Sequence, residues 1–391
     1  MKGKLKEKNV ALWLIHIVLL LIFCVLLVVR ITIGVSDYVF SHSKDTIVDK
    51  GINSIGVWSV AEIPENTNAL EISSLERGRK FRENYRAGNS YPHSERCYLF
   101  LGDDSLNNET LSEVAKRNIK EIILDVDFPD ISPLSDMQSL ETLWISSRVE
   151  HFSPKFSGNF PNLKSFTICT ELDSLGDISK ITSLRELHLQ YINNSFSDIS
   201  GIENLTNLEV LNLNHTNVRD ITALENLVKM RELYLDYTNV YDISAVQNMK
   251  YLEVFSSMQN YYNDEKKPLI TDITALENKT KLRKVNLYGA KITDIRPLEN
   301  DFALEELDLC YTDITSVRPL MHLTNLKFIA VYDCDGIFSV EMNEFYDWIL
   351  SLDHEVNTEG VGYVYRVKEN GEREKITSEN QKEDGLLVGI N

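Results

Sequence analysis

Residues 208–230 read LEVLNLNHTNVRDITALENLVKM, and residues 230–252 read MRELYLDYTNVYDISAVQNMKYL. Counting from Leu208 as position 1, both stretches are apolar at positions 1, 4, 6 and 11, carry Thr at 9, and carry Asp-Ile at 13 and 14. After an insertion, the same pattern returns at 282–304 and 304–326. This period of 22 residues decides the fold, because a self-similar unit of this length indicates a stacked repeat array.

The spacing within one unit has a physical cause. In a strand, positions 4 and 6 point to one face and position 5 to the other. One turn cannot bury its apolar face alone, so turns must stack into a continuous core, closed on the far side by residues such as Val218, Ile221 and Leu224. The Asp at position 13 predicts a turn or capping role, since its carboxylate can accept backbone N–H groups. Weaker copies extend the array back to Ile119 and forward through Leu326, which gives ten turns over 119–340.

This pattern resembles the internalin-type leucine-rich repeats of bacterial surface proteins. The line LxxLxLxxTxIxDIxxL carries the resemblance across the five turns that begin at Leu208, and less closely before them. It implies an α/β solenoid with a curved parallel sheet on the concave side and short helical or 3-10 segments on the convex side. Proteins of this kind are similar in gripping a partner with the curved sheet. Position 9 departs from the wider class, which carries Asn there, whereas this chain mainly has Thr.

Function is expected on the concave face, where positions 3, 5, 7 and 8 point. These positions are rich in aromatic and acidic residues, which favours a protein partner, and the acids would select a basic surface. The alternatives are a cell-envelope polysaccharide, whose rings and hydroxyls suit the same side chains, and a merely solvated face. The predicted partner-binding residues are Trp144, Glu186, His188, Tyr191, His215, Glu232, Tyr234, Asp236, Tyr237, Tyr288, Glu306, Asp308, Tyr311 and Tyr332.

Composition and motifs narrow the function classes. The 391-residue chain has a formal net charge of -19, which argues against a nucleic-acid partner. The sequence contains no phosphate loop, nucleophile elbow or paired-cysteine metal site, so we predict no cofactor, no metal and no enzyme. Activity in residues 36–118 is the alternative, although that stretch offers no constellation to name. The five cysteines are too scattered for a disulfide framework, and only Cys310 and Cys334 sit on neighbouring turns.

The N-terminus predicts a membrane anchor. Residues 10–29 are apolar apart from His16, follow four lysines and end before Arg30, so they are long enough as a helix to cross a bilayer. A cleaved signal peptide is the alternative, but no small-x-small site follows the run. The positive-inside rule puts the N-terminus in the cytoplasm and the repeat domain outside the cell membrane, as a single-pass protein.

The remaining segments are interpreted as flanks. Residues 1–9 form a basic cytoplasmic tail and 30–118 a stalk and N-terminal cap, with a helix expected at 70–85, a strand at 98–101 and a helix at 109–117. Residues 341–391 are expected to contain a closing helix (340–352), a hairpin (362–376) and a loose tail. The extra residues at 259–268, QNYYNDEKKP, should protrude from the rim, either as a contact loop or as a tolerated insertion.

Overall fold

The computed structural model describes residues 55–57, 61, 63, 65–74, 97–101, 107–125, 130–146, 158–169, 172, 174–189, 196–259, 269–334, 336–337, 339–352, 365–367 and 373–375. All of them belong to the compact unit Ser54–Asn391, and none to the other unit, Met1–Asn53. The predicted membrane span at 10–29 therefore lies outside the described residues. Among those described, no helix combines the length and the apolar character that crossing a membrane requires.

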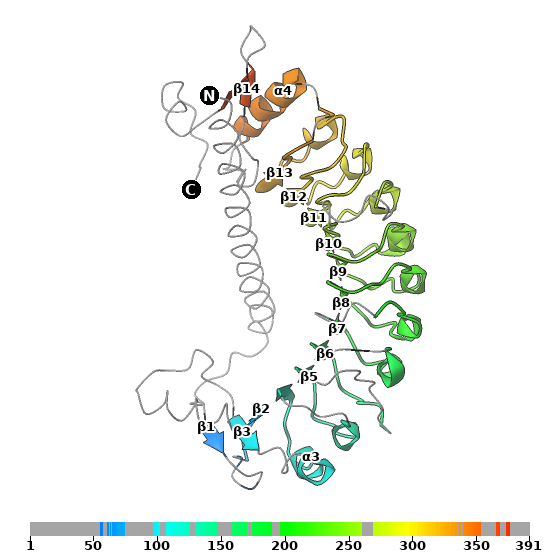
Figure 1. Ribbon diagram of the computed structural model, residues 1–391, viewed down its shortest axis with the longest axis vertical. Helices are drawn as coiled ribbons and strands as arrows, with labels where there is room; N and C mark the ends of the chain where they lie inside the picture. Colours follow the sequence, from blue (N-terminus) through cyan, green and yellow to red (C-terminus); the bar gives the residue numbers. More distant parts are fainter. Residues whose placement is uncertain are drawn as a thin grey trace, which may run out of the picture. The chain divides into compact units, whose positions relative to one another are not determined.

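One parallel sheet runs through the described part of the chain. Its thirteen strands follow the order β1-β3-β2-β4 and then the order of the sequence to β13. Figure 1 shows the strands along the inner side of a curved array. The strands of the predicted turns are β4 (Glu121–Asp125), β5 (Thr142–Ile145), β6 (Ser165–Ile168), β7 (Glu186–Leu189), β8 (Val210–Asn212), β9 (Glu232–Tyr234), β10 (Val254–Ser256), β11 (Lys284–Asn286), β12 (Glu306–Asp308) and β13 (Phe328–Ala330). The ten predicted turns and the parallel sheet are thus confirmed.

Short 3-10 helices line the outer side of the array (Figure 1). They are η3 (Ser132–Leu134), η4 (Gly176–Lys180), η5 (Ile202–Asn204), η6 (Thr222–Leu224), η7 (Ser244–Asn248), η8 (Thr274–Leu276), η9 (Arg296–Leu298) and η10 (Arg318–Leu320). The position-13 aspartate precedes most of these helices and accepts the backbone N–H two residues on. The oxygen-to-nitrogen distance is 2.9 Å from Asp220 to Thr222 and 2.9 Å from Asp242 to Ser244. Of the predicted turn or capping role, the turn is confirmed, because the Asp bonds the N–H two residues on and the N-cap residue of η6 and η7 is the Ile that follows it.

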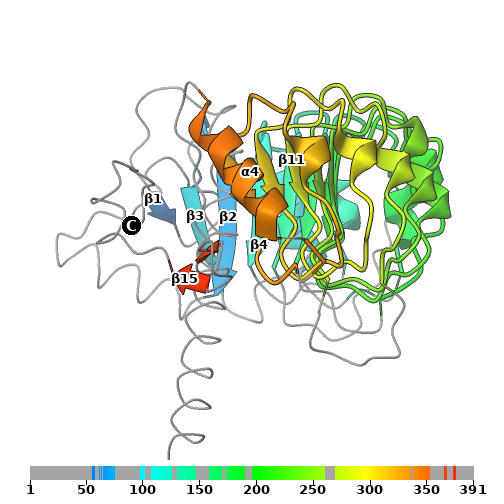
Figure 2. The ribbon, with the colours of Figure 1, turned by 90° about the horizontal axis from the view of Figure 1, so that it is seen from above.

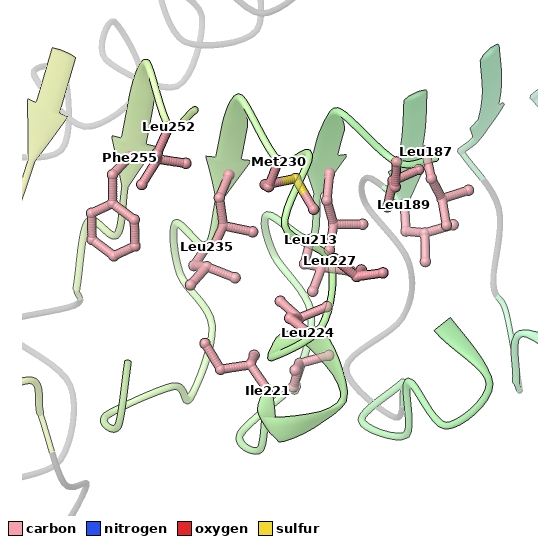
Figure 3. Close-up of a cluster of buried hydrophobic side chains, with 14 of the residues drawn as sticks. Leu187, Leu189, Leu213, Ile221, Leu224, Leu227, Met230, Leu235, Leu252 and Phe255 are labelled. Atoms are coloured by element: carbon pink, nitrogen blue, oxygen red, sulfur yellow. The ribbon is translucent and has the colours of Figure 1, made fainter. Parts of the chain in front are cut away.

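The core lies between the sheet and the outer helices. Leu213 and Leu235 point inward from the strand side, and Ile221 and Leu224 meet them from the outer loops (Figure 3). All four are at most 2 % exposed. Because each turn repeats the same apolar positions, the core continues from turn to turn along the array.

The Thr at position 9 binds within its own turn. The hydroxyls of Thr216, Thr238 and Thr312 each donate to the carbonyl three residues earlier, at 2.7 Å. This bond closes the loop that leaves the strand. It explains how Thr replaces Asn at a position that is buried or nearly so.

A charge ladder crosses the sheet at position 2. Its residues alternate almost strictly in sign: Lys120, Glu141, Lys164, Arg185, Glu209, Arg231, Glu253, Arg283, Glu305 and Lys327. Ion pairs join neighbours, with Arg231 Nε 2.9 Å from Glu253 and Lys327 Nζ 3.0 Å from Glu305. Each pair is partly exposed and contributes little by itself. Together the pairs favour one register between successive turns, since a shift by one residue would separate the paired charges.

The N-terminal end of the sheet differs from the prediction. It contains β1 (Ile55–Val57), β2 (Ala69–Ser74) and β3 (Cys97–Leu101), and β2 pairs with both β3 and β4. The helix predicted at 70–85 is therefore wrong over residues 70–74, while 75–85 lie outside the described residues. Leu70 and Ile72 are buried on one face of the strand, and pairing on both sides outweighs the helical spacing of the apolar residues.

Two other predictions in this region are confirmed. Strand β3 covers the expected strand, and helix α3 (Asn108–Ala115) covers residues 109–115 of the helix expected at 109–117. The Asn107 side chain caps α3 by accepting the backbone N–H of Thr110 at 2.9 Å. Leu111 and Val114 then bury the inner side of this helix against the first turns.

The C-terminal closing elements are also confirmed. Helix α4 (Ser339–Leu350) lies at the β13 end of the array (Figure 1) and in front of the turns in the view from above (Figure 2), with Phe345 buried and stacked on Trp348. Its Glu341 carboxylate accepts the hydroxyl of Ser316 at 2.6 Å and the N–H of Val317 at 2.8 Å. Glu341 thus replaces the Asp that the last turn lacks. The hairpin forms from β14 (Tyr365–Val367) and β15 (Arg373–Lys375), which pair antiparallel.

The thiols of Cys169, Cys310 and Cys334 are free. Cys334 Sγ donates to the carbonyl of Leu309 at 3.1 Å, and Cys310 Sγ accepts the N–H of Tyr332 at 3.4 Å. Cys310 and Cys334, the pair on neighbouring turns, therefore act as hydrogen-bonding groups between turns and do not form a disulfide.

Candidate binding surface

The strand register arranges the predicted residues in rows that cross the sheet. At position 5, Trp144 aligns with Thr167 and His188, and further along Tyr234 aligns with Ser256. Positions 4 and 6 are buried, so positions 3 and 5 face the inner side of the curve. The rows continue through the loop residues at positions 7 and 8, because the position-8 N–H donates to the position-7 carbonyl of the next turn.

The N-terminal members stand apart from the others. Trp144 lies on β5, and Glu186 and His188 lie on β7; Glu186 is exposed and the other two are half-buried. Two strand spacings, about 10 Å, separate Trp144 from His188. Tyr191 lies outside the described residues. The structure therefore gathers these residues on one face but not into one cluster.

A hydrogen-bonded network holds the middle of the surface, on β8 to β10. Asp236 Oδ1 accepts the Ser256 hydroxyl at 2.6 Å and the Met258 N–H at 2.7 Å, and its Oδ2 accepts the Asn214 amide at 3.2 Å. Asn214 in turn accepts the N–H of Asp236 at 2.7 Å. Asp236 therefore ties three turns together. Burial raises the pKa of its carboxyl, against the effect of these hydrogen bonds.

The aromatic part of this region is a stacked pair that we call the middle cluster, His215 and Tyr237. Their ring centroids are 4.7 Å apart, with an interplanar angle of 19°. Burial lowers the pKa of His215, although the nearby charge of Asp236 opposes the change. The half-buried stack is therefore mostly neutral at pH 7 and presents aromatic surface beside a carboxylate.

The Tyr234 side chain, on the strand that precedes Tyr237, has a structural role. Its side chain is only 9 % exposed, and its hydroxyl donates to Glu232 Oε2 at 2.7 Å. Burial raises the pKa of Tyr234, and the charges of Asp236 and Glu306 raise it further. Tyr234 thus fixes Glu232 and offers a partner little area of its own.

Three tyrosines form the C-terminal cluster: Tyr288, Tyr311 and Tyr332. The ring centroids of Tyr288 and Tyr311 are 5.0 Å apart, and those of Tyr311 and Tyr332 are 5.3 Å apart in an edge-to-face arrangement. Such geometries are favoured between aromatic rings. The three half-buried side chains come from successive turns after β11, β12 and β13, so they form one continuous aromatic patch.

The predicted acids near this patch are already engaged within the chain. Asp308 Oδ1 accepts the N–H of Cys310 at 2.9 Å, as Asn286 Oδ1 does for Tyr288 at 3.0 Å one turn earlier. Burial raises the pKa of the Asp308 carboxyl. Asn286, a neutral residue, occupies the same repeat position one turn earlier. Glu306 pairs with Lys284 at 2.7 Å.

Several residues of the surface went unpredicted. Lys284 is the one Lys or Arg at positions 3, 5, 7 and 8 of the described turns, and Asn214 and Ser256 complete the middle network. The repeat numbering already placed all three on the concave face. Their roles could not be predicted from the sequence, because their partners lie 20–22 residues away. Which residues meet across two strands depends on the register of the sheet.

The side chains of this surface are of the kinds that bind a partner through non-covalent contacts. Within the described residues, no group of three or more His, Cys, Asp or Glu side chains could hold a metal ion. What the face offers is aromatic area, amide and hydroxyl groups, and an excess of carboxylates over Lys284.

Sequence comparison confirms the repeat class. A family model described as "Leucine Rich repeats (2 copies)" matches residues 182–226. These residues include β7 and β8, in the middle of the array. No curated protein matches the sequence significantly.

Solved structures with a similar fold include bacterial repeat proteins. An internalin (inlF) from Listeria monocytogenes is 23 % identical, covering 66 % of this chain and 77 % of that one, with a TM-score of 0.48. Internalin C2 from the same organism is 22 % identical over 63 % of this chain and 89 % of that one, at 0.43. A leucine-rich-repeat protein from Leptospira interrogans is 16 % identical over 74 % and 90 %, at 0.41.

Proposed function

We propose that the chain is a binding scaffold whose concave sheet face holds a protein partner. The observation that carries this proposal is the gathering of aromatic side chains from five turns into the middle cluster and the C-terminal cluster. Large, half-buried rings on a rigid sheet supply contact area at low entropic cost. The regular core under them keeps the rings in place, so little ordering is needed on binding.

The charge of the face supports a partner with a basic surface. Glu186 is exposed, and Glu232, Asp236 and Asp333 add carboxylates along the same rows, against the single cation Lys284 at these positions of the described turns. Oppositely charged surfaces attract at long range and repel wrong partners. The net charge of -19 acts in the same direction.

We further propose that the scaffold works outside the cell membrane, held by residues 10–29. The support is the sequence alone: four lysines, then an apolar run of membrane-spanning length. Added protease should then cleave the repeat domain in intact, wall-stripped cells. Full protection of that domain until the cells are lysed would contradict the location.

A polysaccharide of the cell envelope is the second candidate, because stacked tyrosines and carboxylates also suit sugar rings and hydroxyls. The two candidates are separated by binding assays on the purified full chain with Tyr237→Ala and Tyr332→Ala together. Tyr241→Ala is the matched control, since Tyr241 is exposed at repeat position 12, away from the concave rows. Tyr234 is left intact because it is buried.

For a protein ligand, crosslinked partner proteins should be lost in the double variant and kept in the control. Binding to purified wall polysaccharide should be absent in all three proteins. The polysaccharide proposal would replace the protein-partner proposal if two results were obtained together. The wild type and Tyr241→Ala would bind the polysaccharide while the double variant would not, and no protein would be crosslinked.

A further inference from the structure

Most described residues at repeat position 8 have left-handed backbone, and Gln259 is the exception. The φ angle is 59° at His215, 58° at Tyr237 and 60° at Tyr311, and the same position carries Gly289 at 75° and Asp333 at 55°. Glycine, Asn, Asp and His adopt this conformation more readily than other residues, whereas a bulky side chain there is strained. Two tyrosines, Tyr237 and Tyr311, thus occupy a position that does not suit them.

Position 8 also donates a backbone hydrogen bond to the next turn, and Gln259 makes this bond without a left-handed backbone. The N–H of position 8 donates to the position-7 carbonyl of the next turn: His215 to Asp236 at 2.8 Å, and Tyr311 to Tyr332 at 2.7 Å. Gly289 makes the same bond, to Cys310 at 2.9 Å, without any side chain. The ring is therefore not needed to form the turn. Strained residues that the fold does not require occur mostly at functional sites.

The strained rings belong to the two aromatic clusters. His215 and Tyr237 are the middle cluster, and Tyr311 is the centre of the C-terminal cluster, between Tyr288 and Tyr332. The middle cluster follows β8 and β9, and the C-terminal cluster follows β11 to β13. At about 4.8 Å per strand, their centres are about 17 Å apart. An extended peptide covers that distance in about five residues.

We propose that His215, Tyr237 and Tyr311 anchor one extended segment of the partner that carries Arg or Lys side chains about five residues apart, one for each cluster. This rests on the proposed function and names the chemistry of its partner. A cation binds over the face of an aromatic ring, and nearby carboxylates strengthen the attraction. Asp236 lies beside the first cluster, and the exposed Asp333 follows Tyr332 in the second.

The chain itself shows the same contact elsewhere. Arg219 lies over the ring of Tyr241 at 5.0 Å, and Lys281 lies over that of Tyr251 at 4.8 Å. These two tyrosines lie outside positions 3, 5, 7 and 8. They show that exposed tyrosines of this chain bind cations, and they provide matched controls.

The test uses the full chain, purified in a mild detergent, and fluorescein-labelled peptides. Hexa-arginine reaches about 20 Å and can span both clusters, tri-arginine reaches about 10 Å and cannot, and hexa-glutamate controls for the label. Affinity is measured by anisotropy at 150 mM and at 500 mM salt. The variants are Tyr237→Ala, Tyr237→Gly, Tyr311→Ala and Tyr311→Gly, with Tyr241→Ala as control.

The wild-type chain should bind hexa-arginine at least about tenfold more tightly than tri-arginine, because binding at one cluster raises the effective concentration at the other. Each variant of Tyr237 or Tyr311 should lose most of that difference, whereas Tyr241→Ala should stay within about twofold of wild type. Each Gly variant should also unfold at a higher temperature than the matching Ala variant, because glycine relieves the left-handed strain.

Variants of Tyr237 and Tyr311 that bind hexa-arginine as tightly as the Tyr241→Ala control would overturn the proposal. An Ala variant that is as stable as its Gly counterpart would remove the argument from strain. The outcome is separate from the proposed function. If peptide binding depends on Tyr237 and Tyr311 but crosslinks form only to polysaccharide, the protein-partner function is contradicted. If a protein is crosslinked but its binding does not depend on Tyr237 and Tyr311, this proposal alone is contradicted.

Discussion

Lys279 and Asp301 occupy the same repeat position in successive turns, three residues before the first leucine, and their side chains are 3 % and 0 % exposed. The other turns carry buried apolar residues there: Met137, Phe160, Ile181, Leu205, Leu227, Met249 and Leu323. Lys279 Nζ donates to the carbonyl of Gln247 at 2.7 Å. Burial raises the pKa of Asp301 to about 7, against the charge of Lys279. Two turns of the core therefore carry a polar defect.

Restoring the repeat with Lys279→Leu and Asp301→Leu together should stabilise the array. Apolar replacement of buried charged pairs is neutral or stabilising by about 1–4 kcal/mol. The gain should grow with pH, because a carboxyl with a raised folded-state pKa contributes stability below its ordinary pKa near 4 and loses that stability as the pH rises through 7. Urea unfolding at pH 4, 5.5 and 8 measures both effects.

Asp301→Asn is the control for the titration. It keeps a polar group of the same size and removes the charge, so it should flatten the pH dependence between 4 and 8 without the apolar gain. A double Leu variant that unfolds at lower urea than wild type at pH 8 would show that the pair stabilises the array.

Gln259 bridges the base of the insertion that precedes Ile270. Its side chain is 3 % exposed; the amide donates to the carbonyl of Val240 at 2.8 Å and accepts the N–H of Ile270 at 2.8 Å. Gln259→Leu should cost about 2–4 kcal/mol, because two buried backbone groups lose their partners. Exchange of the Ile270 amide proton should accelerate. The exposed Gln138→Leu is the control, and equal stability of the two variants would exclude the bridging role.

Glu341 should be needed to close the C-terminal end. Glu341→Ala removes the acceptor of the buried Val317 N–H and of the Ser316 hydroxyl, at an expected cost of about 1–3 kcal/mol. Hydrogen exchange should rise first around η10 and spread back along the array. Glu344→Ala, at an exposed residue that pairs with Arg318, should change the exchange little. Similar fraying in both variants would indicate a general charge effect.

The cysteines should react slowly in the folded chain. Burial raises the pKa of Cys169 to about 11 and raises the pKa of Cys310 and Cys334 as well. At pH 8 the thiolate of Cys169 is then roughly 100-fold scarcer than in an unperturbed cysteine. Mass spectrometry after iodoacetamide treatment should find these three sites unmodified until urea is added. Complete alkylation within minutes in native buffer would contradict their burial.

The repeat array could be predicted because every turn buries its apolar side chains at the same positions of the repeat. Positions 4 and 6 are apolar in the strong copies, with Ser257 as the exception, and the position-13 Asp repeats because its N–H acceptor role repeats. The error at β2 has the opposite cause. That strand pairs with β3 and β4 out of sequence order, and no repeat marks such pairing.

The binding face was predictable only as a set of rows. Repeat numbering placed Asp236, Asp308 and Tyr234 on the concave side, but all three are largely engaged in holding the sheet together. Tyr311 itself does not indicate its left-handed backbone. The sequence hints at this conformation only through Gly289 and Asp333, which occupy the same repeat position in the neighbouring turns.

The central claim, that the concave face binds a protein, is tested most directly by site-specific photo-crosslinking in intact cells. Benzoylphenylalanine would replace Tyr237 or Tyr332 on the concave face and, as controls, Tyr241 or Tyr251, which lie outside the concave rows. A discrete, protease-sensitive adduct of the same mass should form from Tyr237 and Tyr332 and from neither control. Equal adducts from all four positions, or adducts only from the controls, would contradict the claim.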